Sequence, residues 1–167
     1  MNDEKGNFPV FEEARAELTS FSAGDFKDER TRTVWEYWLR LKAGRNFPGR
    51  SQFDPIDVRH ALGNIVLVDV QGEPPRFRFR LIGSKITRRD GVDMTGRWVD
   101  EVRAEEYRSV ILSRLQGIAA DPRPLLVHTR AFLDDRWRDY EALWLPFAED
   151  GRKVDLMLCC QIYAGDP

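Results

Sequence analysis

The sequence has few of the residues from which metal sites and disulfides are built. It contains two cysteines, Cys159 and Cys160, and two histidines, His60 and His128, among 167 residues. The cysteines are neighbours, and neighbouring residues of a strand point to opposite faces, so we expect no disulfide between them. Because no Cys-x-x-Cys or Cys/His spacing typical of zinc occurs, we predict no metal site and two structural thiols in a reducing compartment.

Long apolar runs are also missing. No stretch approaches the 18 consecutive apolar residues that a membrane-spanning helix needs, and the acidic start of the chain has no apolar signal segment. We therefore expect a cytoplasmic protein without a membrane span. Hydrophobic residues make up 42% of the chain and include five Trp and ten Phe, which is enough for one folded domain with an extension.

The charges are nearly balanced but unevenly distributed. The net charge is -2, with 21 Arg and 5 Lys, and this balance disfavours a nucleic-acid partner. Residues 1–29 carry eight acidic and three basic side chains, which predicts an acidic N-terminal extension. Within it, Phe11, Ala14, Leu18 and Phe21 have helical spacing, so we expect an amphipathic helix there.

A second helix is expected over residues 30–43, ending at Gly44. Its apolar stripe consists of Val34, Trp35, Trp38, Leu39 and Leu41. Asp54-Pro55 then opens a short third helix, with Asp54 as its N-terminal cap. The stripe is broader than one contact with a sheet, so residues 30–63 are predicted to cap the sheet, to dimerise, or to do both, and we expect a homodimer. The alternative is a monomer in which the first helix covers the stripe.

From residue 65 onward the apolar pattern changes from helical spacing to strands. Two apolar runs joined by a turn predict a hairpin. A broken helical stretch and a longer helix over 104–119 follow it. Three further strands, joined by tight turns, complete the pattern. The expected strands are 65–70, 77–82, 125–133, 138–147 and 154–163. We predict an α+β fold with a five-stranded antiparallel sheet, in residues 64–165, with helices inserted between the second and third strands.

Several motifs in this order resemble the PAS-domain family over about residues 60–163. They are Phe77-Arg-Phe-Arg-Leu-Ile-Gly83, Ser84-Lys-Ile-Thr-Arg-Arg-Asp-Gly91, Met94-Thr-Gly-Arg97 and the hairpin from Trp144-Leu-Pro-Phe147 through Asp150-Gly151. Tyr37-Trp38, Asp54-Pro55 and Gly91-Val-Asp-Met-Thr-Gly-Arg97 resemble, more narrowly, short bacterial PAS proteins with a tryptophan-rich N-terminal helix. The resemblance implies a sensory or interaction protein of signal transduction, acting through another protein. It also implies that a small molecule can lie between the sheet and the inserted helices.

The usual cofactors of such a fold find no attachment point in this sequence. Residues 84–120 contain no His or Cys, which disfavours haem, and the Asn-Cys-Arg-Phe motif of the photoadduct flavin proteins is absent. We therefore expect no cofactor, or an unidentified apolar or amphipathic ligand. The predicted pocket residues are Phe79, Leu81, Trp98, Val102, Ile111 and Leu115. Arg78 and Arg80 are predicted to face outward, and an inward orientation would instead favour a carboxylate ligand.

The sequence contains no catalytic motif of the common hydrolase, zincin or P-loop types. His60, His128, Asp69 and Glu141 are candidate bases, but nothing in the sequence places any of them beside a nucleophile. We therefore expect a non-catalytic protein. The alternative is a small cone-shaped α+β enzyme or ligand carrier, but that fold places long helices first, and the early hairpin here favours PAS.

Overall fold

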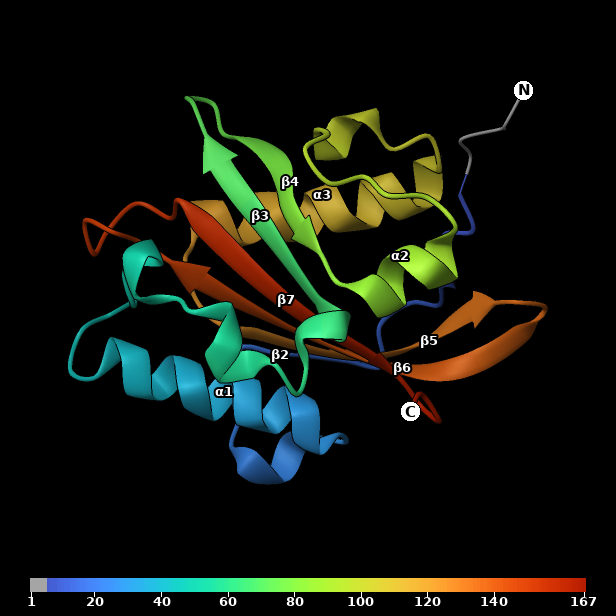
Figure 1. Cartoon of the computed structure of the whole chain (residues 1–167), viewed down its shortest axis with the longest axis horizontal. Helices are drawn as coiled ribbons and strands as arrows, with labels where there is room; N and C mark the ends of the chain where they lie inside the picture. Colours follow the sequence, from blue (N-terminus) through green and yellow to red (C-terminus); the bar gives the residue numbers. More distant parts are fainter. Residues whose placement is uncertain (1–5) are drawn as a thin grey trace.

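The structure is a computed structural model that describes residues 6–167. In these residues a curved antiparallel sheet of seven strands lies between helices on both of its faces (Figure 1). The strands are β1 (Val10–Phe11), β2 (Ala16–Leu18), β3 (Ile65–Gln71), β4 (Arg76–Ile82), β5 (Leu125–Leu133), β6 (Arg136–Phe147) and β7 (Leu156–Tyr163). The α-helices are α1 (Glu29–Lys42), α2 (Ser84–Asp90) and α3 (Glu105–Ala120). The 3-10 turns are η1 (Ala23–Asp25), η2 (Arg50–Gln52), η3 (Pro55–Val58), η4 (Leu62–Asn64) and η5 (Val99–Glu101).

The strand order is β1-β5-β6-β7-β3-β4, and β2 pairs with β5 next to β1. The α+β class and the helices inserted between β4 and β5 confirm the fold expected from the sequence. All five predicted strands are present, with ends within two residues of the prediction. The expectation of exactly five strands is wrong in the described residues, because two short strands from the N-terminal segment extend the sheet.

The predicted amphipathic helix around Phe11 and Leu18 does not form. Val10 and Phe11 instead pair with Phe132 and Ala131 of β5, and β2 pairs with the same strand closer to its start. A short polar helix is marginal on its own, whereas the edge of β5 offers a row of unpaired backbone groups. Tertiary pairing therefore overrides the helical spacing of the side chains. The predicted helix after Asp54 is the 3-10 turn η3, capped by the Asp54 side chain, which accepts from the Ile56 N–H at 2.9 Å.

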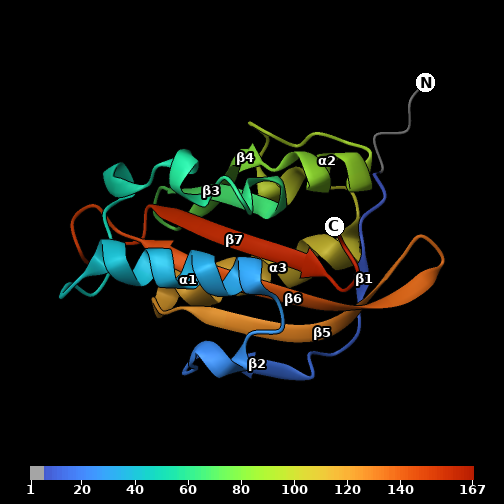
Figure 2. The same cartoon turned by 60° about the horizontal axis from the view of Figure 1, so that its bottom comes forward.

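The two faces of the sheet bury different side chains, as strand alternation requires. Leu67 and Leu158 face α1, whereas Val68 and Met157 belong to the cluster beneath α2 and α3. Figures 1 and 2 show α1 along one face of β6 and β7, with α2 and α3 on the opposite side. One close approach fixes α2: a Cβ on Gly83 would lie 2.4 Å from the backbone oxygens of the η4 turn.

Helix α1 is anchored to the sheet by its apolar stripe and by one indole hydrogen bond. Val34 and Trp38 are buried, and the Trp38 Nε1–H donates to the Pro146 carbonyl at 2.9 Å. Trp35 is half-buried beneath Phe21 and Phe26, with ring-centre distances of 5.7 and 5.3 Å. The chain's own N-terminal segment therefore covers part of the stripe.

The rest of the stripe is less covered. Leu39 and Leu41 are half-buried, and Trp35 and Leu39 line a groove of about 540 Å³. The homodimer, and the division of the chain into residues 1–29, 30–63 and 64–165, stay predictions.

Candidate functional site

The six side chains predicted to line a pocket do not gather around one cavity. Phe79, Val102, Ile111 and Leu115 are buried in the cluster between the sheet and α2/α3. None of these four lines any of the five cavities described for residues 6–167. These four side chains therefore pack in the hydrophobic core and line none of these five cavities.

Leu81 belongs to the opposite face, against the α1 cluster. Leu67 pairs with Leu81 but Val68 pairs with Phe79, so Arg80 is an extra residue in β4. This β-bulge reverses the side-chain alternation after Phe79, which the uninterrupted sequence pattern did not reveal.

Trp98 is likewise displaced from the predicted site. It is half-buried at the edge of β4, where it forms an isolated bridge with Arg78 and lies 4.1 Å beneath the Arg76 guanidinium. The outward orientation predicted for Arg78 and Arg80 is confirmed, since both are exposed. Arg78 donates to the Gly96 carbonyl, and Arg80 lies 3.6 Å from Asp69.

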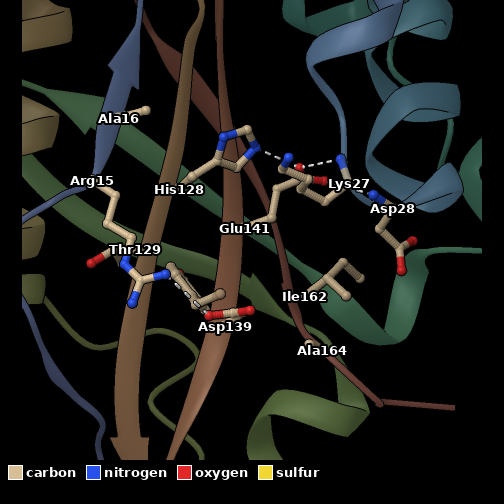
Figure 3. Close-up of a pocket in the computed structure, with 11 residues that line it drawn as sticks. Arg15, Ala16, Lys27, Asp28, His128, Thr129, Asp139, Glu141, Ile162 and Ala164 are labelled. Carbon is tan, nitrogen blue, oxygen red and sulfur yellow. Dashed lines mark hydrogen bonds and ion pairs between the residues drawn. The ribbon is translucent and has the colours of Figure 1, made fainter.

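A cavity of about 500 Å³ lies on the other face, between strands β5 to β7 and the N-terminal segment (Figure 3). Its lining combines apolar and charged groups: Arg15, Ala16, Lys27, Asp28, His128, Thr129, Asp139, Tyr140, Glu141, Ile162 and Ala164. Arg15 and Asp139 approach to 3.7 Å at one side of the cavity.

Glu141 is the central group of this cavity and is only 4% exposed. Its carboxylate accepts from the backbone N–H groups of Lys27 at 2.6 Å and Asp28 at 3.2 Å, and from the Thr31 hydroxyl. These donors belong to the start of α1, where the first N–H groups of a helix lack intrahelical partners and the dipole favours an anion. A carboxylate from the middle of β6 thus caps α1.

His128 supplies the fourth hydrogen bond to Glu141. The two residues are directly opposite in the β5–β6 ladder, and Nε2 lies 2.7 Å from Oε2. A carboxylate only accepts hydrogen bonds, so we assign a hydrogen to Nε2 of His128, which donates to Glu141. Residues 6–167 contain no cluster of three His, Cys, Asp or Glu side chains that could hold a metal ion.

The length of the turn between β5 and β6 is a signal for this pair in the sequence. The two-residue turn Asp134-Asp135 places Leu133 opposite Arg136, and counting back along both strands brings His128 opposite Glu141. Lys27 and Asp28 could not have been found in this way, because their position depends on how α1 docks.

The inner face of the sheet holds a second polar group of residues, between the strands and α2/α3. The Arg89 guanidinium lies 4.4 Å from the Tyr163 ring centre and 3.0 Å from the Asp90 carboxylate. Burial raises the pKa of Asp90 to about 6, against the opposing effect of Arg89. Arg114 enters the same layer from α3, with its guanidinium 5.6 Å from the Phe11 ring. Neither arginine was predicted as a site residue, although Arg114 falls on the apolar face of α3, three residues after Ile111.

Comparison with known proteins agrees with this architecture. A family model described as a PAS domain matches residues 26–161, from the segment before α1 into β7. Comparison with curated proteins gives no match. None of the helices in the described part of the chain has the length and apolar character needed to cross a membrane. The narrower resemblance to short bacterial PAS proteins stays a prediction. With most of its length matched, and its helices inserted after the first long hairpin, the chain belongs to the PAS-domain family.

Proposed function

We propose that this protein is a non-catalytic sensory PAS protein that passes its signal to another protein through the N-terminal segment and α1. Family membership supports a sensory role in signal transduction. The route is supported by one observation above all: the buried Glu141 carboxylate holds the start of α1 and His128 together.

The attachment of α1 lies directly behind the inner core. Successive strand residues point to opposite faces, so Tyr140 packs on the α2/α3 side while Glu141 faces α1. Tyr140 donates a hydrogen bond to Gln161, which ties β6 to β7. A ligand that shifts β6 from the inner side would therefore move the carboxylate that caps α1. Keeping or breaking the hydrogen bonds to Glu141 would supply the two states that a switch requires.

The receiving surface is the outer side of α1. Trp35 and Leu39 line its groove together with Pro122 and Pro124, and a second copy of the chain is the partner we propose for it. The two buried free cysteines are in keeping with the reducing cytoplasm.

Hydrogen–deuterium exchange measured by mass spectrometry tests the route. The variant Glu141→Gln keeps the side-chain size but places an NH₂ group against N–H donors. We expect exchange in residues 26–34 to increase at least about tenfold, with β3 and β7 still protected, because an opening made easier by about 1.4 kcal/mol is ten times more populated. Light scattering on the same samples reports whether the association state changes with it.

Two further variants keep the result interpretable. Glu149→Gln is the matched control, because the Glu149 carboxylate also accepts from a backbone N–H and a hydroxyl, both of Ser51, but is exposed. Thr31→Val removes a single hydrogen bond to Glu141 and is expected to give a smaller increase in the same residues. Unchanged exchange at residues 26–34 in both Glu141→Gln and Thr31→Val would overturn the proposed route.

A further inference from the structure

Three exposed apolar side chains lie side by side on the β5–β6 hairpin, which projects from one end of the sheet (Figure 2). They are Val10, Phe132 and Trp137, with 43%, 37% and 40% of their surface exposed. The strand register puts Phe132 directly opposite both of the others, so the three form one row across β1, β5 and β6. Within residues 6–167, Ile56 is the only other large apolar residue that is exposed. An apolar patch of this kind marks a site of protein contact.

The patch is preorganised and faces the same side of the sheet as α1. The ring centres of Phe132 and Trp137 lie 5.4 Å apart, and the Arg130 guanidinium lies 5.6 Å from the Trp137 ring centre. Ala131 and Leu133, the neighbours of Phe132, belong to the cluster beneath α2 and α3, so Phe132 points to the opposite face. Side chains that are already held in place lose little freedom when a partner covers them.

The groove of about 540 Å³ beside α1 lies on this same face, at the other end of β5. Trp35 and Leu39 line it from α1, and Pro122 and Pro124 line it from the segment that precedes β5. Pro124 and Phe132 are eight residues apart along this extended chain, which separates the groove from the patch by about 25 Å. The patch therefore cannot enter the groove of its own chain.

The charged side chains that line the groove are cationic. They are Lys42 and Arg123. Arg123 lies 3.4 Å from Asp121, but both side chains are more than half exposed, and an exposed pair of this kind is easily replaced by another carboxylate.

The hairpin carries the opposite charge next to its patch. Asp134 and Asp135 form the turn between β5 and β6, and both are exposed. Arg136 follows them, but it is opposite Leu133 in the ladder and so points to the α2/α3 face, away from the patch. The hairpin tip and the groove therefore match in apolar character and in charge.

We propose that the hairpin tip of one molecule, with Val10, Phe132 and Trp137, inserts into the α1 groove of a second copy of the chain. The patch and the groove lie on one face at the two ends of β5, so a two-fold axis near the middle of this strand would place each tip on the other molecule's groove. This contact rests on the dimer proposed above for the α1 groove, and it names the segment that occupies the groove.

The amount of surface involved requires both contacts. The exposed parts of the three apolar side chains sum to roughly 200 Å², so one tip in one groove buries roughly 400 Å² in total. Stable interfaces bury about 1,200–2,000 Å². One contact is therefore too small to hold two molecules together, whereas two contacts and the charged surface between them approach the required size.

Disulfide trapping in a mixture of two variants tests the arrangement. Val10→Cys places a thiol in the patch and keeps both aromatic rings, Asn46→Cys places one in the groove, and the native cysteines are buried. We expect a cross-linked dimer when the two variants are mixed and mildly oxidised. We expect none when either variant is oxidised alone, since equivalent residues lie far apart across the axis.

A second mixture supplies the control. Ser109→Cys, at an exposed position on α3, takes the place of Asn46→Cys and should give no cross-link with Val10→Cys. Cross-linking of Val10→Cys with itself would show that the tips meet each other and would overturn the proposal. Equal cross-linking with Asn46→Cys and with Ser109→Cys would overturn it as well.

Sedimentation equilibrium measures how much the patch contributes to association. Trp137→Ala is expected to weaken the dimer at least about tenfold, because tryptophans near the centre of an interface contribute most to affinity. Ile56→Ala is the matched control, since Ile56 is 65% exposed but lines neither the patch nor the groove. Equal dissociation constants for Trp137→Ala and Ile56→Ala would refute the contact.

The two proposals fail separately. A dimer that Trp35→Ala weakens and Trp137→Ala does not would keep the α1 groove as the interface and remove the hairpin as its occupant. Cross-linking between the patch and the groove, without any effect of Glu141→Gln on exchange, would keep this dimer and remove the output route.

Discussion

Replacing Glu141 with glutamine should destabilise the protein far more than its small change in size suggests. The carboxylate accepts four hydrogen bonds, two at each oxygen. Glutamine retains one oxygen, so two donors face its NH₂ group. Two hydrogen bonds to a charged acceptor are worth about 3 kcal/mol, and the lost interaction with the α1 dipole adds about 0.5 kcal/mol. We expect the free energy of unfolding to fall by about 3–4 kcal/mol.

Urea unfolding at pH 7, followed by circular dichroism, measures this loss. With a denaturant slope of about 2 kcal/mol per molar urea, the midpoint should decrease by about 1.5–2 M. Glu149→Gln, in the exposed turn between β6 and β7, should leave the midpoint almost unchanged because solvent replaces its hydrogen bonds. Equal midpoints for Glu141→Gln and Glu149→Gln would refute the reasoning that burial increases the contribution of the Glu141 hydrogen bonds to stability.

Three further predictions concern other parts of the molecule. Light scattering at about ten micromolar, a concentration at which typical obligate interfaces stay associated, should show a dimer, and Trp35→Ala should weaken it. Trp38→Ala should instead lower the free energy of unfolding by about 3–5 kcal/mol, because Trp38 is buried within the monomer. A monomeric wild-type protein would contradict the dimer. The folded-state pKa of Asp90 is about 6, above its ordinary value of 3.8, so between pH 4 and 6 the folded protein holds a proton on Asp90 that the unfolded chain has lost. The free energy of unfolding should therefore fall by up to about 3 kcal/mol as the pH rises through that range. Asp90→Asn should abolish this loss of stability, as measured by urea unfolding at several pH values. If the wild type and Asp90→Asn lose stability in parallel over this range, Asp90 does not cause the loss. Gly83→Ala should lower the melting temperature, because its Cβ would meet backbone oxygens at 2.4 Å, whereas Gly117→Ala on the exposed side of α3 has open space and should raise stability by about 0.5–1 kcal/mol.

The five longer strands and helices α1 and α3 were predictable because apolar runs, helical spacing and turn residues mark them in the sequence. Successive side chains of β7 enter the apolar clusters on opposite faces of the sheet, α3 buries one helical face, and both elements form near their predicted bounds. The candidate sites were less predictable. His128 and Glu141 were recognised only as separate bases, and the predicted pocket included Leu81 and Trp98, which the structure places elsewhere.

The sequence by itself determined the local conformations and the register of the β5–β6 hairpin, because both depend on residues that are close together along the chain. Only the tertiary structure decided the rest. The N-terminal segment became strands because β5 offered an open edge, and Leu81 changed faces because a single residue bulges opposite β3. Arg89 and Arg114 lie inside because two helices pack onto one sheet face, and no local pattern states which charged side chains such packing will enclose.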